Sequence, residues 1–180
     1  MSAPARYDAT TQTLHWLTAI LVVVAFFYGP TGSEAVVFAP GRNFDRDLHE
    51  TLGLWIFALT VVRLLWGIGE SRPRSSIAGS ISHWVLYGLL IALPLTAVLG
   101  SWLSGHAITL FAGQIPSPLP VAHRTGMAIL EVHAWLGDAI LWLAGLHAAA
   151  AIYHHWVLKD GVLSSMLPAL RRSGSPPRAS

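Results

Sequence analysis

Residues 132–157 read VHAWLGDAILWLAGLHAAAAIYHHWV, an apolar stretch of the length that a membrane-spanning helix needs. One acidic residue, Asp138, interrupts it, and His133 and His147 stand 14 residues apart within it. At about 100° per residue these two side chains lie within roughly 40° of one helix face and about 21 Å apart along the axis. The stretch therefore predicts a spanning helix that carries one imidazole near each membrane surface.

Three further apolar stretches of similar length stand upstream, at about residues 12–29, 50–69 and 83–103. The second contains Arg63, and the third contains Pro94, a kink that neighbouring helices of a bundle tolerate. We expect an all-α fold, a four-helix antiparallel bundle in the membrane, with residues 1–180 forming a single membrane domain. The tail at residues 173–180 is small and polar, so we expect it to be disordered.

The composition favours the same fold class. Hydrophobic residues make up 53% of the chain and charged residues 11%, against about 25% charged in an ordinary soluble domain. No charged residue occurs between Asp8 and Glu34 or between Arg74 and Arg124. The net charge of +2 gives no argument for a nucleic-acid partner. The lack of cysteine excludes disulfides, iron–sulfur clusters and covalently attached c-type haem.

The first apolar stretch has a second interpretation, as a cleaved signal peptide, because the basic residue Arg6 precedes it. Its apolar run is long for a signal peptide, however, and no clear cleavage site of small residues follows it directly. We therefore favour a retained spanning helix over the signal-peptide interpretation.

Lysine and arginine predict the orientation of the bundle, because short cytoplasmic loops of membrane proteins are enriched in both. With both termini in the cytoplasm, the inner side carries Arg6, Arg72, Arg74, Lys159, Arg171, Arg172 and Arg178. The opposite side then carries Arg42, Arg46 and Arg124. This bias leads us to expect that both termini are cytoplasmic.

The antiparallel order brings four histidines to two depths. His15 stands near the inner end of the first helix, level with His147, and His49 stands near the outer end of the second, level with His133. We expect the pairs His15/His147 and His49/His133. Two opposed imidazoles fill both axial positions of an iron, which suits an electron-transfer haem. The pattern thus predicts two haem groups with these four axial ligands.

Other interpretations of the histidines need weighing. A single histidine within a membrane is more often a packing or hydrogen-bonding residue than a metal ligand, so the argument depends on all four together. A zinc site would gather three or four ligands at one depth, whereas these pairs are separated by about 21 Å. A haem-free structural or transport protein is the remaining interpretation, and it predicts a colourless, folded preparation.

Three further residues are candidates for the inner site. His154 follows His147 by seven residues on nearly the same face, where it could replace His147 as ligand, line a quinone pocket or cap the helix. His83 could contact a haem propionate or a quinone carbonyl, or be a hydrated residue at a helix end. Arg63 lies 14 residues after His49, and a haem propionate would supply the anion that an intramembrane arginine needs. Snorkelling of Arg63 to the headgroups is the alternative.

Four segments carry a resemblance to a known family: YDATTQTLHW (7–16), HETLGLWIFALTVVRLLW (49–66), HWVLYGLLIALPLT (83–96) and EVHAWLGDAILWLAGLHAAAAIYHHWVLKDGVL (131–163). The last is the most specific, with two histidines 14 residues apart, a His-His pair and a Lys-Asp-Gly turn. Over nearly its whole length the chain resembles the bacterial cytochrome b561 family, four-helix proteins of the inner membrane with two b-type haems. The resemblance implies axial ligands at His15, His49, His133 and His147.

Members of this family are quinone-linked, and at least one type is understood to oxidise superoxide at the periplasmic face and to reduce ubiquinone. The resemblance therefore implies an oxidoreductase that moves electrons across the inner membrane to a quinone from a periplasmic donor, with superoxide as a candidate. The quinone contacts that we expect are His154, His83 and Lys159. The alternative is a haem-bearing membrane anchor, an electron conduit whose outer loops dock a partner dehydrogenase or hydrogenase.

A superoxide site would need a cationic surface on the outer side, because opposite charge attracts an anion. The basic candidates there are Arg42, Arg46, His123 and Arg124. The acidic residues Glu34, Asp45, Asp47 and Glu50 share that side and weaken the field.

Overall fold

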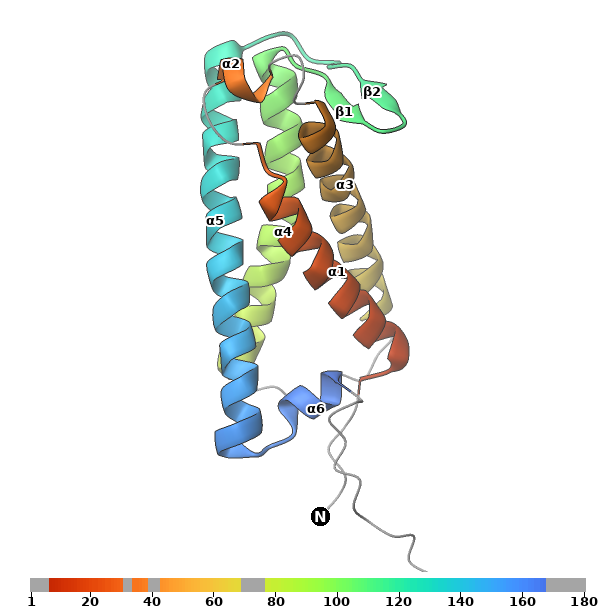
Figure 1. Cartoon of the computed structure of the whole chain (residues 1–180), viewed down its shortest axis with the longest axis vertical. Helices are drawn as coiled ribbons and strands as arrows, with labels where there is room; N and C mark the ends of the chain where they lie inside the picture. Colours follow the sequence, from red (N-terminus) through yellow and green to blue (C-terminus); the bar gives the residue numbers. More distant parts are fainter. Residues whose placement is uncertain (1–6, 31–33, 39–42, 69–76, 168–180) are drawn as a thin grey trace, which may run out of the picture.

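The computed structural model describes residues 7–30, 34–38, 43–68 and 77–167 (Figure 1). The tail that the sequence predicts to be disordered lies outside these ranges. So do six of the seven basic residues that predict the cytoplasmic side, namely Arg6, Arg72, Arg74, Arg171, Arg172 and Arg178.

The described chain is mainly α-helical, and four helices dominate it: α1 (Ala9–Phe27), α3 (Asn43–Trp66), α4 (Ile77–Ser104) and α5 (His123–Tyr153). All four are long and apolar enough to cross a membrane. They run alternately up and down the long axis of the molecule (Figure 1). The expected all-α class and the antiparallel four-helix bundle are thereby confirmed.

The helices start earlier than their apolar stretches suggest. α1 begins at Ala9 because the carboxylate of Asp8 accepts hydrogen bonds from the backbone N–H groups of Thr10 and Thr11, both at 3.1 Å. α5 begins at His123, ahead of the stretch that starts near residue 132. Apolar composition marks the part of a helix that suits lipid, whereas the helix itself continues until its backbone is capped or turned.

Short elements close the two ends of the bundle (Figure 1). At one end lie α2 (Glu34–Val37) and an antiparallel hairpin of β1 (Ile108–Leu110) and β2 (Gly113–Ile115). At the other end, α5 continues into a π-helical turn, His154–Leu158, and the chain reverses into α6 (Val162–Met166). The side chain of Trp16 on α1 donates a hydrogen bond to the carbonyl of Met166 at 3.0 Å, so α6 is attached to the start of α1.

A central apolar layer joins the four long helices, with one buried residue from each: Ala25, Ile56, Leu90 and Ile140. Outside this layer, large apolar side chains face outward, as at Trp142, which is 76% exposed. A soluble protein rarely shows so much contiguous apolar surface, whereas a lipid bilayer would cover it.

Glycine brings α4 and α5 into close contact. A Cβ atom built on Gly126 would lie 2.2 Å from the backbone nitrogen of Ser104, and one on Gly100 would lie 2.9 Å from the side chain of Leu130. Small residues at a helix crossing allow two backbones to approach closely in a membrane, where van der Waals packing drives association. The α4–α5 pair is therefore the most tightly packed part of the bundle.

Candidate metal centres

The structure brings four histidines together as two separate pairs. The ring centres of His49 on α3 and His133 on α5 are 6.0 Å apart, with an angle of 89° between the ring planes. The ring centres of His15 on α1 and His147 on α5 are 6.5 Å apart, with an angle of 58°. All four side chains are half-buried. The first pair lies toward the end with α2 and the hairpin, and we name it the outer pair; the second is the inner pair.

Both separations fit one metal ion between each pair of rings. An imidazole nitrogen bound to a metal lies about 2 Å from it, and the nitrogen lies roughly 1 Å from its own ring centre. Opposed rings on one ion are therefore separated by roughly 6 Å. Among the described residues, no group of three or more His, Asp or Glu side chains is arranged to hold a metal ion. Two-ligand pairs suit an iron whose other ligands come from a macrocycle.

Hydrogen bonds fix the rings of the outer pair. Nδ1 of His49 lies 2.7 Å from the carbonyl oxygen of Ala25, and Nδ1 of His133 lies 2.9 Å from that of Leu93. A carbonyl only accepts, so each Nδ1 carries the proton and each Nε2 keeps its lone pair. This is the state that a metal ligand needs, with its second nitrogen held by an outer partner.

Side chains, rather than carbonyls, contact the rings of the inner pair. Nδ1 of His147 lies 3.2 Å from the hydroxyl oxygen of Ser82. Nδ1 of His15 lies 3.4 Å from Nη2 of Arg63, whose guanidinium also lies over the ring of Tyr87. Within the described part of the chain, no hydrogen bond engages Nε2 of any of the four paired histidines. A guanidinium only donates, so Nδ1 of His15 accepts in this contact and its Nε2 carries the proton. Metal binding at Nε2 of His15 would require that proton to move to Nδ1 and Arg63 to turn away from it.

Space for a flat macrocycle adjoins the outer pair. Gly53 and Gly137 each follow a paired histidine by one helical turn, on the same face of α3 and α5. Both residues are half-buried, yet a Cβ atom at either position would meet nothing within 4 Å. This contrasts with the crowded glycines of the α4–α5 crossing. The donor atoms and the open space together fit a haem.

The other inner candidates of the sequence divide into two groups. His83 lies beside the inner pair, with its ring centre 5.4 Å from that of His147, and Arg63 also lies there, as described above. His154 instead makes a short contact with the carboxylate of Asp160 at the turn after α5. α5 stays α-helical up to His154, whose backbone N–H donates to the carbonyl of Ala150, and the π-helical turn begins there.

Ser82 is a residue that the sequence analysis missed. It stands 65 positions from His147, and no spacing signal links a serine on one helix to a histidine on another. The carbonyl partners on Ala25 and Leu93 are backbone atoms, so residue type does not indicate them at all. Only the packing of the helices makes these contacts visible.

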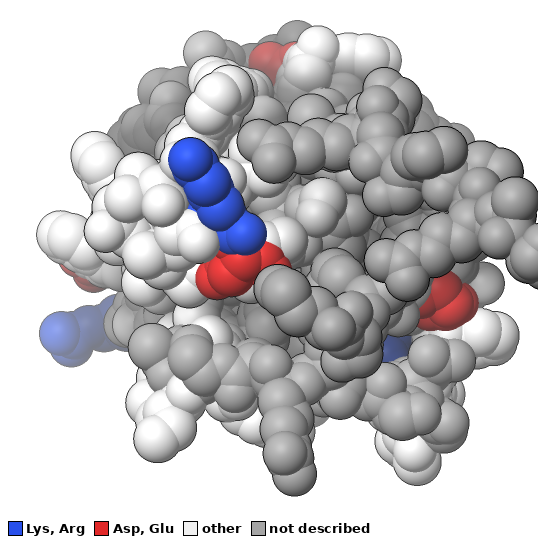
Figure 2. Space-filling view, turned by 90° about the horizontal axis from the view of Figure 1, so that it is seen from below, with Lys and Arg blue, Asp and Glu red and all other residues white. Residues whose placement is uncertain are grey.

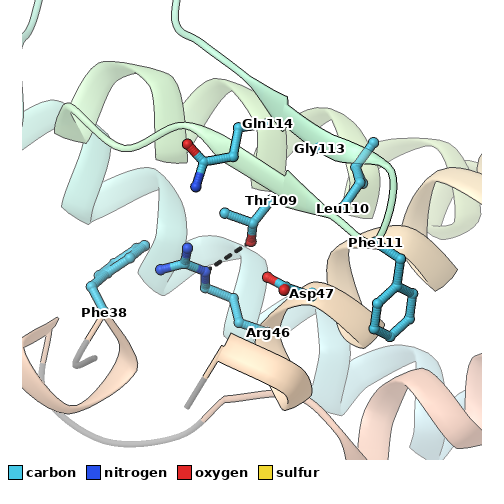
Figure 3. A pocket seen from close by; sticks show the side chains of 8 residues that line it. All are labelled: Phe38, Arg46, Asp47, Thr109, Leu110, Phe111, Gly113 and Gln114. Carbon is cyan, nitrogen blue, oxygen red and sulfur yellow. Dashed lines mark hydrogen bonds between the residues drawn. The ribbon is translucent and has the colours of Figure 1, made fainter. Parts of the chain in front are cut away.

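The outer end holds a pocket of about 390 Å³ between α2, the start of α3 and the hairpin (Figure 3). Arg46 lines it and donates a hydrogen bond from Nε to the hydroxyl of Thr109 at 3.0 Å. Nε of the same side chain lies 3.8 Å from the carboxylate of Glu50. The positive charge of Arg46 is therefore partly neutralised where the sequence suggested an attractive surface for an anion.

A carboxylate also contacts two histidines at the outer end that do not belong to the outer pair. The side chain of Glu34 on α2 lies 3.0 Å from Nε2 of His106 and 3.3 Å from Nε2 of His123. The hydrogen bond from His106 lowers the pKa of Glu34 below its ordinary value of 4.5. On the opposite end of the molecule, basic and acidic side chains also lie side by side in the described part of the surface (Figure 2).

Comparison with known proteins gives one family and several relatives. A family model described as prokaryotic cytochrome b561 matches residues 6–169. The chain is 29% identical to a protein of Yersinia pestis named "probable superoxide oxidase CybB", over 92% of this chain and 98% of that protein. It is 27% identical to cytochrome b561 homolog 2 of Escherichia coli (strain K12), over 92% of this chain and 93% of that protein. It is 28% identical to cytochrome b562 of Cereibacter sphaeroides, over 93% and 98% respectively.

Proposed function

This chain belongs to the prokaryotic cytochrome b561 family of membrane electron-transfer proteins, for which b-type haem is implied, and we propose that it binds two haems and passes electrons between them. This proposal is supported above all by the two imidazole pairs. The ring centres are 6.0 Å apart in the outer pair and 6.5 Å apart in the inner pair. Each pair offers two Nε2 atoms to one iron, so His49 and His133 would hold one haem and His15 and His147 the other.

A haem with two imidazole ligands supplies a one-electron couple without an open iron position for substrate. The protein then contributes position and electrostatics. The carbonyls of Ala25 and Leu93 fix the tautomer and the angle of the outer rings. At the inner site, the guanidinium of Arg63 lies beside His15, and a haem propionate there would be an anion of the kind that an intramembrane arginine needs.

We propose that the protein lies in the bacterial inner membrane with both termini in the cytoplasm. In this proposal quinone is the electron acceptor, and it binds on the inner, cytoplasmic side. His83 is the best supported contact, because its ring lies beside that of His147 at the inner site. His154 and Lys159 stand together near the reversal of the chain after α5, where Asp160 contacts His154. These two residues are the candidates for proton exchange with water near a bound quinone.

The donor in this proposal reaches the outer pair, and superoxide is the first candidate because a relative is named a probable superoxide oxidase. The charge pattern of the outer end argues for only modest electrostatic attraction. Arg46 lies close to Glu50, and Glu34 lies between His106 and His123. Delivery of an anion would therefore depend weakly on ionic strength.

The test uses the purified protein in lipid vesicles that contain a quinone, with superoxide generated outside. We expect haem reduction and quinone reduction above the spontaneous rate, both abolished by superoxide dismutase. His147→Ala should reduce quinone at least tenfold more slowly, whereas Trp142→Phe, at an outward-facing position, should match the wild type. Haem reduction no faster than the spontaneous rate would contradict superoxide as donor. A dehydrogenase or hydrogenase that co-purifies in mild detergent would favour the membrane-anchor alternative.

A further inference from the structure

The two histidine pairs differ in what their Nδ1 atoms face. In the outer pair, both Nδ1–H groups donate to backbone carbonyls, at 2.7 and 2.9 Å, and Nδ1 of His133 also lies 3.4 Å from the hydroxyl oxygen of Thr96. In the inner pair, one Nδ1 faces the hydroxyl of Ser82 at 3.2 Å, and the other faces the guanidinium of Arg63 at 3.4 Å. The helices therefore give similar ligands two different surroundings.

Hydrogen bonding at Nδ1 changes how strongly an imidazole donates electrons to its metal. A strong acceptor at Nδ1–H increases the basicity of the ligand, which favours the oxidised, more positive iron. A carbonyl oxygen at 2.7 Å is a closer acceptor than a hydroxyl at 3.2 Å. By this effect, the outer pair would give a lower reduction potential than the inner pair.

The charge of Arg63 acts in the same direction. The guanidinium of Arg63 is a donor toward Nδ1 of His15, so it does not make the ring a more basic ligand. Its positive charge also opposes a positive charge on the iron, and charges interact strongly within a low-dielectric interior. If Arg63 paired with a propionate, it would also raise the reduction potential of the inner haem, because it would neutralise a negative charge near the macrocycle. Both arrangements favour the reduced inner site.

We propose that Arg63 sets the inner haem at a higher reduction potential than the outer haem, because Ser82 is a weaker acceptor than the outer carbonyls and offsets this charge only in part, so that electrons would move from the outer pair to the inner pair. This inference rests on the proposed di-haem function and adds a direction and two positioning residues to it. One electron leaves the outer iron, which is oxidised from Fe(II) to Fe(III), and the same electron reduces the inner iron from Fe(III) to Fe(II). No proton is needed for this transfer.

The inference makes opposite predictions for the two side chains. Loss of the cation in Arg63→Gln should lower the reduction potential of the inner haem. Arg63→Lys keeps a positive charge, so it should lower this potential much less. Loss of the hydroxyl in Ser82→Ala removes the acceptor from His147 and should raise the inner potential. A merely structural role for these residues would not produce shifts of opposite sign.

The measurement is a potentiometric titration of the haem absorption bands in the purified holoprotein. His147→Ala, which should lose the inner haem, identifies the outer potential as the one that remains. In Arg63→Gln, we expect the reduced-to-oxidised ratio of the inner haem at a fixed ambient potential to fall at least tenfold, which is about 59 mV for one electron. Thr60→Val is the matched control, because it removes a fully buried hydroxyl from α3 that contacts no paired histidine. It should leave both potentials unchanged.

The outcomes separate this inference from the function on which it rests. A wild-type preparation with fewer than two haems would overturn the proposed di-haem function. Two haems with equal potentials, or with the higher potential remaining in His147→Ala, would overturn the inference alone. An unchanged reduction potential of the inner haem in Arg63→Gln would also overturn the inference. So would an equal decrease of this potential in Arg63→Lys and in Arg63→Gln.

Discussion

At the scale of single residues, histidines of similar burial differ in their hydrogen-bond partners. His49 and His147 are both half-buried histidines on long helices, yet one ring is fixed by a carbonyl and the other by a hydroxyl. The same holds at the outer surface, where His106 and His123 share one carboxylate, that of Glu34. These contacts connect α2 to His106 in the segment after α4 and to His123 at the start of α5.

The lowered pKa of Glu34 predicts a pH-dependent contribution to stability. A carboxyl whose pKa is lower in the folded state stabilises the protein above its unfolded pKa, and this stabilisation is lost as the pH falls through the folded value. Wild-type protein should therefore be more heat-stable than Glu34→Gln at about pH 6, and the difference should shrink as the pH falls below 4.5 and through the lowered folded pKa of Glu34. Thermal unfolding of both proteins across this range measures it. A difference that is independent of pH would show that the charge of Glu34 has no such role.

At the scale of elements, the close crossing of α4 and α5 depends on glycine. A Cβ atom on Gly126 would lie 2.2 Å from a backbone nitrogen and 2.7 Å from the carbonyl oxygen of Gly100, and no side-chain rotation relieves contacts with backbone atoms. Because His133 and His147 are both on α5, a shift of this helix would move half of the proposed ligands.

Gly126→Ala should destabilise the bundle by about 1–3 kcal/mol, the range for overpacking a tightly packed interior. Gly145→Ala on the same helix is the control, because its Cβ would meet nothing within 4 Å and alanine favours a helix by about 1 kcal/mol over glycine. Unfolding in mixed detergent micelles compares the two variants. Equal stability of Gly126→Ala and Gly145→Ala would mean that the crossing can separate without cost.

Sequence patterns predicted the long helices more fully than the elements between them. Long apolar runs identify spanning helices because lipid requires them, and the antiparallel order then brought His15 to the level of His147 and His49 to that of His133. The hairpin at residues 108–115 has no comparable signal, since its two strands are three residues each. Likewise, no sequence pattern predicted the π-helical turn at residues 154–158 or the contact of His154 with Asp160.

At the scale of the whole molecule, the bundle combines a small apolar core with two histidine pairs. The core has one buried apolar residue on each of the four long helices. The helix that supplies one histidine to each pair, α5, fixes the distance between the sites. Its partners come from two other helices, α1 and α3, so each site depends on the assembly of the bundle and not on a local motif.

The measurement that tests this account most directly is the haem content of the purified protein, with reduced-minus-oxidised spectra, compared with those of His15→Ala and His133→Ala. We expect two low-spin b-type haems in the wild type, and the loss of one haem in each variant, the inner one in His15→Ala and the outer one in His133→Ala. One haem or none in the wild type would contradict the account, as would the loss of the same haem from both variants.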